Sequence, residues 1–304
     1  MMKTDRFLHT DQTSCFDEKG LEIDCLNSCQ DGAFGSTQPE TLNRFNIIDK
    51  IVKDQWTGLV WPINANLADF PLTWKESFEF VKEMNHSKRF DRSDWKMPTR
   101  KELFSLISHQ QINPSLPKKH PFNNYFNGYY WTGTECARLP NQAWYIHMGG
   151  ARVYRGMKHG SYMVWPVAGT GFEADTIKNR FVKTEHSFFD RLTRRTWLNG
   201  KWLDNSSLTW QEALDRIKTI NTEKVAGYCD WRLPNIRELE SLIDVNKHSP
   251  AFSSGCPLHK IQEGYWSGTN SLYETRYAWV LYTQDGVIGV GYKPQQAFYL
   301  LAIR

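Results

Sequence analysis

The sequence predicts two tandem domains of the α+β class, each with two helices and a small antiparallel sheet. Five motifs recur in the same order, the first three 136 residues apart and the last two 135 residues apart. The repeated segments are 43–45 with 179–181, 72–74 with 208–210, 94–98 with 230–234, 130–134 with 265–269, and 143–144 with 278–279. Because this period is far longer than the ~20–50 residues of a solenoid repeat, each copy should fold as a separate domain. We therefore expect a leader over residues 1–42, a first domain over 43–169 and a second domain over 179–304.

The first helix of each copy is predicted from its capping residues. Thr73 and Glu76 have the spacing of a capping box, in which each side chain bonds the backbone N–H of the other residue. Apolar residues then recur at helical spacing, and the second copy repeats the pattern after Thr209. Asn85 and Asn221 are expected to end the two helices.

A second helix should follow an Asp-Trp turn and a proline in each copy. Thr99 and Glu102 again have capping-box spacing, and Asn235 and Glu238 repeat it in the second copy. The two glutamates resemble candidate catalytic acids, but the capping role accounts for both of them.

The remaining elements of each copy should be strands. Aromatic and β-branched runs favour strands, and Gly149-Gly150 and Asp285-Gly286 supply turns between them. In the first copy we expect an opening hairpin within 44–61 and strands near 129–132, 143–147, 151–154 and 162–167. The second copy should repeat the last two of these strands at 287–290 and 298–303, and the closing strand of each copy could meet its opening hairpin.

Composition argues against several functional classes. The net charge of +4 over 304 residues is too small to indicate a nucleic-acid partner. No apolar stretch approaches the ~18–20 residues of a membrane span. The first residues also lack the apolar run of a secretory signal, which predicts either an intracellular protein or a mature chain from which a signal was removed.

Three motifs carry a resemblance to a known family. They are Asp-Trp-[Arg/Lys]-[Leu/Met]-Pro-x-x-x-Glu-Leu, Tyr-Trp-[Ser/Thr]-Gly-Thr, and Ala-Trp with a glycine downstream. Together they resemble the C-terminal domain of the Legionella collagen-like protein, a family common in bacterial surface proteins. The first motif is also similar to a helix segment of formylglycine-generating enzymes. The resemblance implies a C-type-lectin-like fold and relatives that are often exported, and the segment 13–32 looks like the one that precedes this domain in relatives.

Enzymatic chemistry has little support in the sequence. No glycine-rich phosphate loop, His-Glu-x-x-His motif or Gly-x-Ser-x-Gly elbow is present. Formylglycine-generating enzymes use cysteines late in the domain, but this chain has no cysteine after Cys256, and Cys136 has no close partner in sequence. We expect a non-enzymatic protein without a cofactor. A degenerate enzyme of the formylglycine-generating type is the alternative.

Three cysteines gather in the leader. Cys15, Cys25 and Cys29 with His9 could bind zinc, but their spacing matches usual zinc sites poorly. We favour a hairpin that brings Cys15 and Cys25 face to face, and we expect no metal. The leader has few periodic apolar residues, so it should dock, either on the first domain or on another subunit of an oligomer. The calcium-binding motifs of true C-type lectins are absent, so glycan binding should not need calcium.

Tryptophan is unusually abundant, and most of it is duplicated. Ten of the 13 tryptophans occur in matched pairs, so we expect them in the two cores: Trp61/Trp197, Trp74/Trp210, Trp95/Trp231, Trp131/Trp266 and Trp144/Trp279. Trp56, Trp165 and Trp202 have no counterpart, which makes them better candidates for ligand contact.

The clearest difference between the copies is a run of basic and aromatic residues in the first. Most of these residues have no counterpart in the second copy, and basic groups among aromatic rings suit a sulfated or carboxylated glycan. The candidate ligand-binding residues are Trp144, His147, Arg152, Tyr154, Arg155, Lys158 and His159. A solvated basic face is the plainer interpretation, and the run Arg191, Arg194 and Arg195 has the same ambiguity. A structural subunit that binds protein partners is the rival function.

Overall fold

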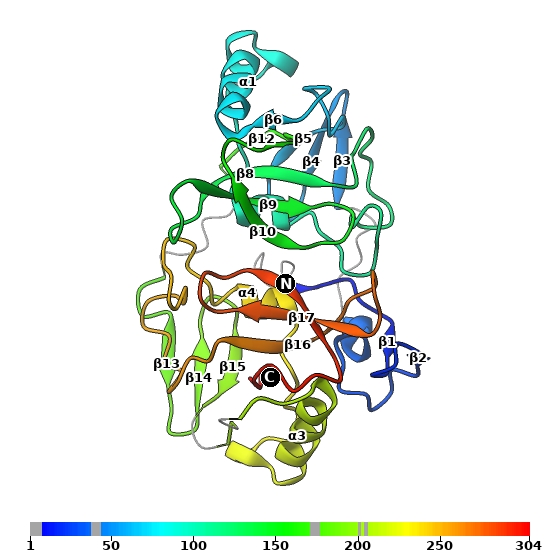
Figure 1. Cartoon of the computed structure of the whole chain (residues 1–304), viewed down its shortest axis with the longest axis vertical. Coiled ribbons are helices and arrows are strands. Elements are labelled where there is room, and N and C mark those ends of the chain that lie inside the picture. Colours follow the sequence, from blue (N-terminus) through cyan, green and yellow to red (C-terminus); the bar gives the residue numbers. More distant parts are fainter. Residues whose placement is uncertain (1–7, 38–43, 171–176, 200–201, 204–205) are drawn as a thin grey trace. The chain divides into compact units, whose positions relative to one another are not determined.

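The computed structural model describes residues 8–37, 44–170, 177–199, 202–203 and 206–304 (Figure 1). The chain forms two compact units, Pro39–Glu173 and a unit that combines Met1–Gln38 with Ala174–Arg304. We call residues 44–170 the first domain, residues 8–37 the leader, and residues 177–304 the second domain. Residues 1–7 and 38–42 of the predicted leader, and Asn43 of the first repeated motif, lie outside the described residues.

The opening hairpin and the closing strand of the first domain meet in one antiparallel sheet. Its strands in spatial order are β3 (Phe45–Ile48), β4 (Ile51–Asp54), β5 (Val60–Pro62), β12 (Val167–Ala168) and β7 (Trp95–Lys96). Ala168 pairs with both Val60 and Trp95, so the two ends of the domain are joined. The prediction that the terminal strands could meet is confirmed.

The second half of the first domain is a three-stranded antiparallel meander. Strands β8 (Tyr129–Glu135), β9 (Gln142–His147) and β10 (Val153–Met157) pair in sequence order. A short pair, β6 (Leu72–Thr73) with β11 (Ser161–Tyr162), returns the chain toward the first helix. The aromatic runs over 129–132 and 143–147 form strands as predicted, and the strand predicted over 151–154 begins at Val153. The closing strand predicted over 162–167 is divided into the two-residue strands β11 and β12.

The second domain repeats this order. Its opening strands are β13 (Phe181–Lys183), β14 (Ser187–Asp190) and β15 (Arg195–Leu198), and its meander is β16 (Gly264–Asn270), β17 (Tyr277–Tyr282) and β18 (Ile288–Tyr292). The closing segment pairs only through isolated bridges, among them Trp197 with Ile303 and Leu208 with Phe298. The strand predicted over 298–303 is thus reduced to single contacts.

All four predicted helices begin at a capping box. They are α1 (Trp74–His86), α2 (Arg100–Phe104), α3 (Trp210–Thr222) and α4 (Ile236–Glu240). Short 3₁₀ segments lie at η2 (Asp31–Thr37), η3 (Arg89–Asp91) and η4 (Val225–Gly227). Capping of this kind contributes about 1 kcal/mol per helix, which matters most for the five-residue helices α2 and α4.

The asparagines near the ends of α1 and α3 have a different role from the one predicted. Each helix continues one residue past the asparagine, and the left-handed residues are Lys88 and Lys224. The Asn85 amide instead accepts a bond from the Trp95 N–H and donates one to the Trp95 C=O, both at 2.8 Å. Asn221 holds the backbone of Trp231 in the same way, so each first helix is tied to the Asp-Trp turn that follows it.

The paired tryptophans are core residues, as predicted. Nine of the ten are buried, and Trp74 is half-buried. Two unpaired tryptophans that were expected at a ligand site are also buried: Trp165 packs edge-on against Trp61, and Trp56 lies under the guanidinium of Arg44. That prediction is wrong for both, because a large ring without a counterpart can still fill a core. Trp202 is half-buried against the core of the second domain.

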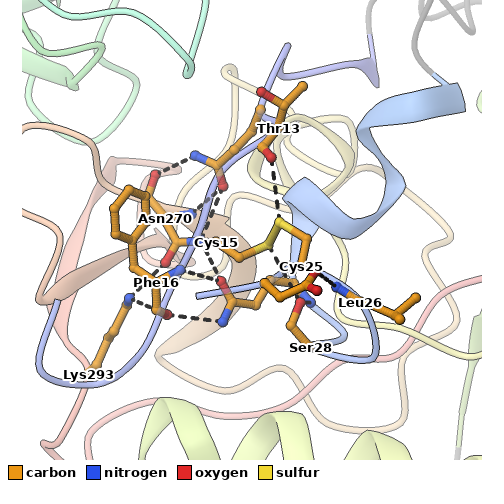
Figure 2. The surroundings of a disulfide bond; sticks show 11 residues. Thr13, Cys15, Phe16, Cys25, Leu26, Ser28, Asn270 and Lys293 are labelled. Carbon is orange, nitrogen blue, oxygen red and sulfur yellow. Dashed lines mark hydrogen bonds between the residues drawn. A yellow bond between two sulfur atoms is a disulfide. The ribbon is translucent and has the colours of Figure 1, made fainter. Parts of the chain in front are cut away.

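The leader docks on the second domain, and the expectation that it packs on the first domain is wrong. Cys15 and Cys25 form a disulfide that closes the hairpin of β1 (Cys15–Phe16) and β2 (Glu22–Ile23) (Figure 2). The side chain of Gln12 bonds the backbone of Asn270 at the end of β16.

No helix in the described part of the chain is long and apolar enough to cross a membrane.

Candidate functional site

Four tyrosines gather on one face of the first domain's meander. Alternation along antiparallel strands places Tyr145 of β9 beside Tyr154 of β10, and Tyr129 of β8 lies opposite His147. Ring centroids are 4.7 Å apart for Tyr129 and Tyr145, 5.1 Å for Tyr145 and Tyr162, and 6.3 Å for Tyr145 and Tyr154. We call Tyr129, Tyr145, Tyr154 and Tyr162 the tyrosine face.

The outer rings of the tyrosine face reach solvent while the inner rings support them. Tyr129 is 41 % exposed and Tyr154 is 37 % exposed, whereas Tyr145 is buried and Tyr162 is half-buried. Tyrosine combines a flat apolar ring with a polar hydroxyl, so it can stack on one face of a sugar and hydrogen-bond at its edge. The arrangement suits a ligand that lies flat on the sheet.

Two arginines lie close to the ring of Tyr154. The guanidinium carbons of Arg152 and Arg155 lie 5.7 and 4.9 Å from the centroid of the Tyr154 ring. Arg152 is exposed and Arg155 is half-buried. A guanidinium held over an aromatic ring keeps its planar fork oriented, and that fork fits carboxylate or sulfate oxygens.

The surroundings of Tyr145, Tyr162 and His147 shift their pKa values so that all three side chains stay neutral. Burial, followed by the neighbouring Tyr162 and Tyr129, raises the pKa of Tyr145 to about 12. Burial and then Tyr129 raise the pKa of Tyr162, while burial and then Arg152 lower the pKa of His147. The Tyr145 and Tyr162 hydroxyls therefore remain donors at physiological pH, and the arginines supply the positive charge.

The second domain has the same sheet without this face. Gly264, Val280 and Gly289 stand where the first domain has Tyr129, Tyr145 and Tyr154, and valines stand where it has the two arginines. One feature is shared: a Cβ added to Gly156 would lie 2.7 Å from the Tyr162 ring, and one added to Gly291 would lie 2.6 Å from Phe298. The ring that covers the glycine thus belongs to the fold, whereas the exposed tyrosines and arginines belong to the first domain.

The seven residues predicted from the sequence do not share one surface. His147, Arg152 and Tyr154 lie on or beside the tyrosine face. Arg155 pairs with Trp144 and so starts from the opposite side of the sheet, but its guanidinium carbon lies 4.9 Å from the centroid of the Tyr154 ring. Trp144 is buried on the opposite side of β9, under the guanidinium of Arg100, so its inclusion at the ligand surface is corrected.

Lys158 and His159 follow the far end of β10. The Lys158 Nζ is 2.7 Å from a carboxylate oxygen of Glu135 and 4.4 Å from the Trp74 ring centroid. His159 is exposed. These two residues therefore lie apart from the Arg152 end of the strand.

Sequence reasoning missed three of the four tyrosines. Tyr129 and Tyr145 were assigned only to strands, and Tyr162 to a closing strand. A signal was present, since Tyr129 and Tyr145 are matched by glycine and valine in the second copy.

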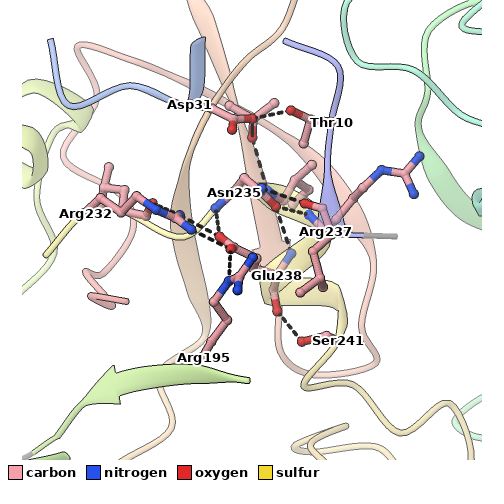
Figure 3. Close-up of polar contacts among 12 residues, drawn as sticks. Thr10, Asp31, Arg195, Arg232, Asn235, Arg237, Glu238 and Ser241 are labelled. Carbon is pink, nitrogen blue, oxygen red and sulfur yellow. Dashed lines mark hydrogen bonds and ion pairs between the residues drawn. The ribbon is translucent and has the colours of Figure 1, made fainter. Parts of the chain in front are cut away.

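Arg195 of the second basic run has a structural role, whereas Arg191 and Arg194 are exposed. The Nε of Arg195 lies 3.1 Å from the carboxylate of Glu238, which also accepts bonds of 2.6 and 2.7 Å from Arg232 (Figure 3). Burial alone would raise the pKa of Glu238, but the two arginines outweigh it and lower the value to about 2. Glu102 pairs with Lys96 at 2.6 Å in the first domain. The two glutamates cap their helices, as predicted, and also neutralise buried or half-buried cations.

The hairpin that brings Cys15 and Cys25 face to face is present, and these cysteines do not form the alternative zinc site. Cys15 and Cys25 are joined in the disulfide, and the Cys29 thiol is half-buried, with its pKa raised by burial. Over residues 8–37, 44–170, 177–199, 202–203 and 206–304, no three His, Cys, Asp or Glu side chains come together to hold a metal ion.

Two segments of the chain match the model of one protein family. Residues 50–168 and 187–304 each match the model of the Lcl C-terminal domain, and together they make up most of the chain. Comparison with curated proteins finds no match.

Proposed function

Because the chain belongs to the Lcl C-terminal domain family and carries two tandem copies of that domain, we propose that it is a non-enzymatic binding protein. Its ligand in this proposal is an anionic glycan, and the binding surface is the tyrosine face with Arg152 and Arg155. We also propose the C-type-lectin-like fold for each copy. The antiparallel sheets, the two helices and the joined ends of the first domain support that fold.

The observation that carries the proposal is that the guanidinium groups of Arg152 and Arg155 both lie near the exposed Tyr154 ring, a combination that the second domain lacks. A group of side chains that the fold requires would be expected in both copies of the domain. An exposed ring with cations beside it offers both contacts that a sulfated or carboxylated sugar needs, namely stacking and a charge-assisted hydrogen bond.

A binding experiment with a sulfated and a neutral polymer tests the proposal. The full chain should bind heparin oligosaccharides and not dextran of similar length, and affinity should fall as salt rises, because the Debye length shrinks to ~8 Å near physiological ionic strength. Replacing Arg152 by Ala should weaken heparin binding by about tenfold or more, since one charge-assisted bond contributes about 1.5–3 kcal/mol, and replacing Arg155 as well should weaken it further.

Matched variants in the second domain serve as controls. Arg276→Ala removes an exposed arginine and Tyr273→Ala removes an exposed tyrosine, and neither belongs to the proposed surface. Both should leave heparin binding unchanged, while Tyr154→Ala should weaken it. Equal losses in Arg276→Ala and Arg152→Ala, or no heparin binding at low salt, would refute the proposal.

A further inference from the structure

The leader pairs with the edge of the second domain's meander through a side-chain amide. Gln12 Oε1 accepts a bond of 2.7 Å from the Asn270 N–H, and Gln12 Nε2 donates one of 2.9 Å to the Asn270 C=O. A neighbouring strand would bond the same two backbone groups, so Gln12 completes an open strand edge. The Asn270 side chain adds a bond of 2.8 Å from its Nδ2 to Gln30 Oε1.

A buried carboxylate fixes the leader at a second point. Asp31 Oδ2 accepts bonds of 2.6 and 2.7 Å from the hydroxyls of Thr10 and Thr269, close to Arg232 (Figure 3). Thr10 lies in the leader and Thr269 in β16, so the carboxylate joins the two.

A buried lysine bonds the leader's backbone. The Lys293 Nζ donates to the carbonyls of Phe16 and Asp17 at 3.1 and 3.0 Å and to Asn270 Oδ1 at 2.7 Å (Figure 2). It also lies 4.3 Å from the centroid of the Trp210 ring. Lys293 and Trp210 are both 0 % exposed in this arrangement.

The first domain repeats the residues that hold the leader on the second domain. Lys158, Trp74 and Thr134 stand where the second domain has Lys293, Trp210 and Thr269. The Lys158 ammonium lies over the Trp74 ring at 4.4 Å, as its counterpart does at 4.3 Å. Trp74 is only half-buried, however, and Phe78 is 40 % exposed where its counterpart Leu214 is 1 % exposed.

The strand edge of the first domain is open in the same place. Glu135 lies opposite Ala143, and the next ladder bond runs from the Cys136 N–H to the Gln142 C=O at 3.0 Å. In an antiparallel ladder, the N–H and C=O of the residue beside such a bonded pair point away from the partner strand. The backbone groups of Glu135 therefore face outward, as those of Asn270 face Gln12.

One substitution changes which segment this surface can accept. Glu135 replaces Asn270, so a carboxylate would face the Gln30 carbonyl oxygen of the chain's own leader. Two acceptors cannot bond each other, and this mismatch disfavours the leader. A basic side chain at the position of Gln30 would instead form an ion pair with Glu135, which is 59 % exposed at its side chain.

We propose that the first domain binds an extended segment of another protein in the way that the second domain binds the leader. An acidic residue of the segment would bond Thr134 and lie near Lys96, which are the counterparts of Thr269 and Arg232. A basic residue of the segment would form an ion pair with Glu135. This surface lies at the Lys158 end of β10, so it is distinct from the tyrosine face.

Two synthetic peptides of residues 8–37, each closed by the Cys15–Cys25 disulfide, test the proposal on the full chain. One has the natural sequence and the other carries Gln30→Lys. The Gln30→Lys peptide should bind about tenfold more tightly than the natural peptide in calorimetry, because it pairs with Glu135. Hydrogen exchange should then slow in β8 and at Lys158.

The same peptides are then tested on the full chain with Glu135→Asn, as the reciprocal experiment. This substitution gives the first domain the chemistry of Asn270, so the variant should prefer the natural peptide and lose the preference for Gln30→Lys. Glu135 is exposed, and a melting curve would check that the variant folds. Binding by neither peptide to either chain, an unchanged preference in Glu135→Asn, or protection confined to β16 would each overturn the proposal.

Discussion

The guanidinium of Arg44 is bonded through two nitrogens to the carboxylate of Asp54, at 3.1 and 2.8 Å, with both side chains buried. Its Nη2 also donates to the Ser105 C=O at 2.7 Å, which ties the opening hairpin to the end of α2. Arg180 and Asp190 repeat the pair in the second domain, with bonds of 2.8 and 2.7 Å. The repeated Asn-Arg-Phe motif therefore marks a buried ion pair in each domain.

Breaking this pair should destabilise one domain at a time. Arg44→Ala leaves the Asp54 carboxylate buried without its partner, so the unfolding transition of the first domain should lose about 3–5 kcal/mol. Arg180→Ala should do the same to the second domain. Denaturant unfolding followed by hydrogen exchange in each domain measures both. Replacing Arg44 and Asp54 together by Met and Leu should restore most of the loss, and a double variant as unstable as Arg44→Ala would contradict the explanation.

The tryptophans of the Asp-Trp turns should be equally important in the two domains. Trp95 and Trp231 are 3 % and 2 % exposed, and their indole N–H groups donate to Arg89 and Val225 carbonyls at 2.9 and 3.0 Å. Replacing either by Ala should cost about 3–5 kcal/mol in the domain that carries it. Tyr273→Ala, which removes a ring that is 66 % exposed, should change stability by less than about 0.5 kcal/mol. A small loss at either tryptophan would show that its site can collapse.

Local patterns predicted the parts of the fold that depend on a few neighbouring residues. Each capping box spans four residues, so Thr73 with Glu76 could be identified without any knowledge of tertiary structure. Duplication then identified the core, since a matched pair such as Trp95 and Trp231 is kept for packing. The lack of a counterpart was a misleading signal, because Trp165 was assigned to a ligand site although it fills the core.

Contacts between residues far apart in the sequence could not be predicted from local patterns. Gln12 and Asn270 are 258 residues apart, and no local pattern links them. Tyr162 reaches the tyrosine face only because β11 returns beside β6, which the sequence does not specify. Strand register also decided which candidates share a surface, since Trp144 and Tyr145 are neighbours in sequence but face opposite sides of β9.

Leader docking should weaken as pH rises through the titration of Asp31. Burial raises the pKa of Asp31 from 3.8 to about 6, despite the hydroxyl bonds from Thr10 and Thr269. The docked leader therefore holds a proton that the undocked leader has lost between these two values, so docking becomes less favourable as pH increases across this window. Hydrogen exchange of the leader amides at several pH values measures the effect. Asp31→Asn should remove this dependence, while Glu22→Gln, at an exposed position, should keep it.

The second domain should lose stability in acid through Glu238. Since Arg232 and Arg195 lower the pKa of Glu238 from 4.5 to about 2, the carboxylate stabilises the domain above the unfolded value. That contribution should disappear as pH falls from about 4.5 toward 2. Glu238→Gln should cost on the order of 3 kcal/mol at neutral pH and little at pH 2. Glu102→Gln should cost less, because its partner Lys96 is 39 % exposed at its side chain. Equal losses in the two variants would contradict this argument.

Removing the leader should destabilise the second domain and leave the first unchanged. A chain that begins at Leu42 lacks the partners of Asn270, Thr269 and Lys293, so three buried polar groups of the second domain would be left to bond water at a newly open strand edge. Its melting transition should fall by about 5 °C or more. Since the leader docks on its own chain, light scattering should give the same number of chains per particle with and without it. A multiple mass that drops to one chain on deletion would assign the leader to assembly instead.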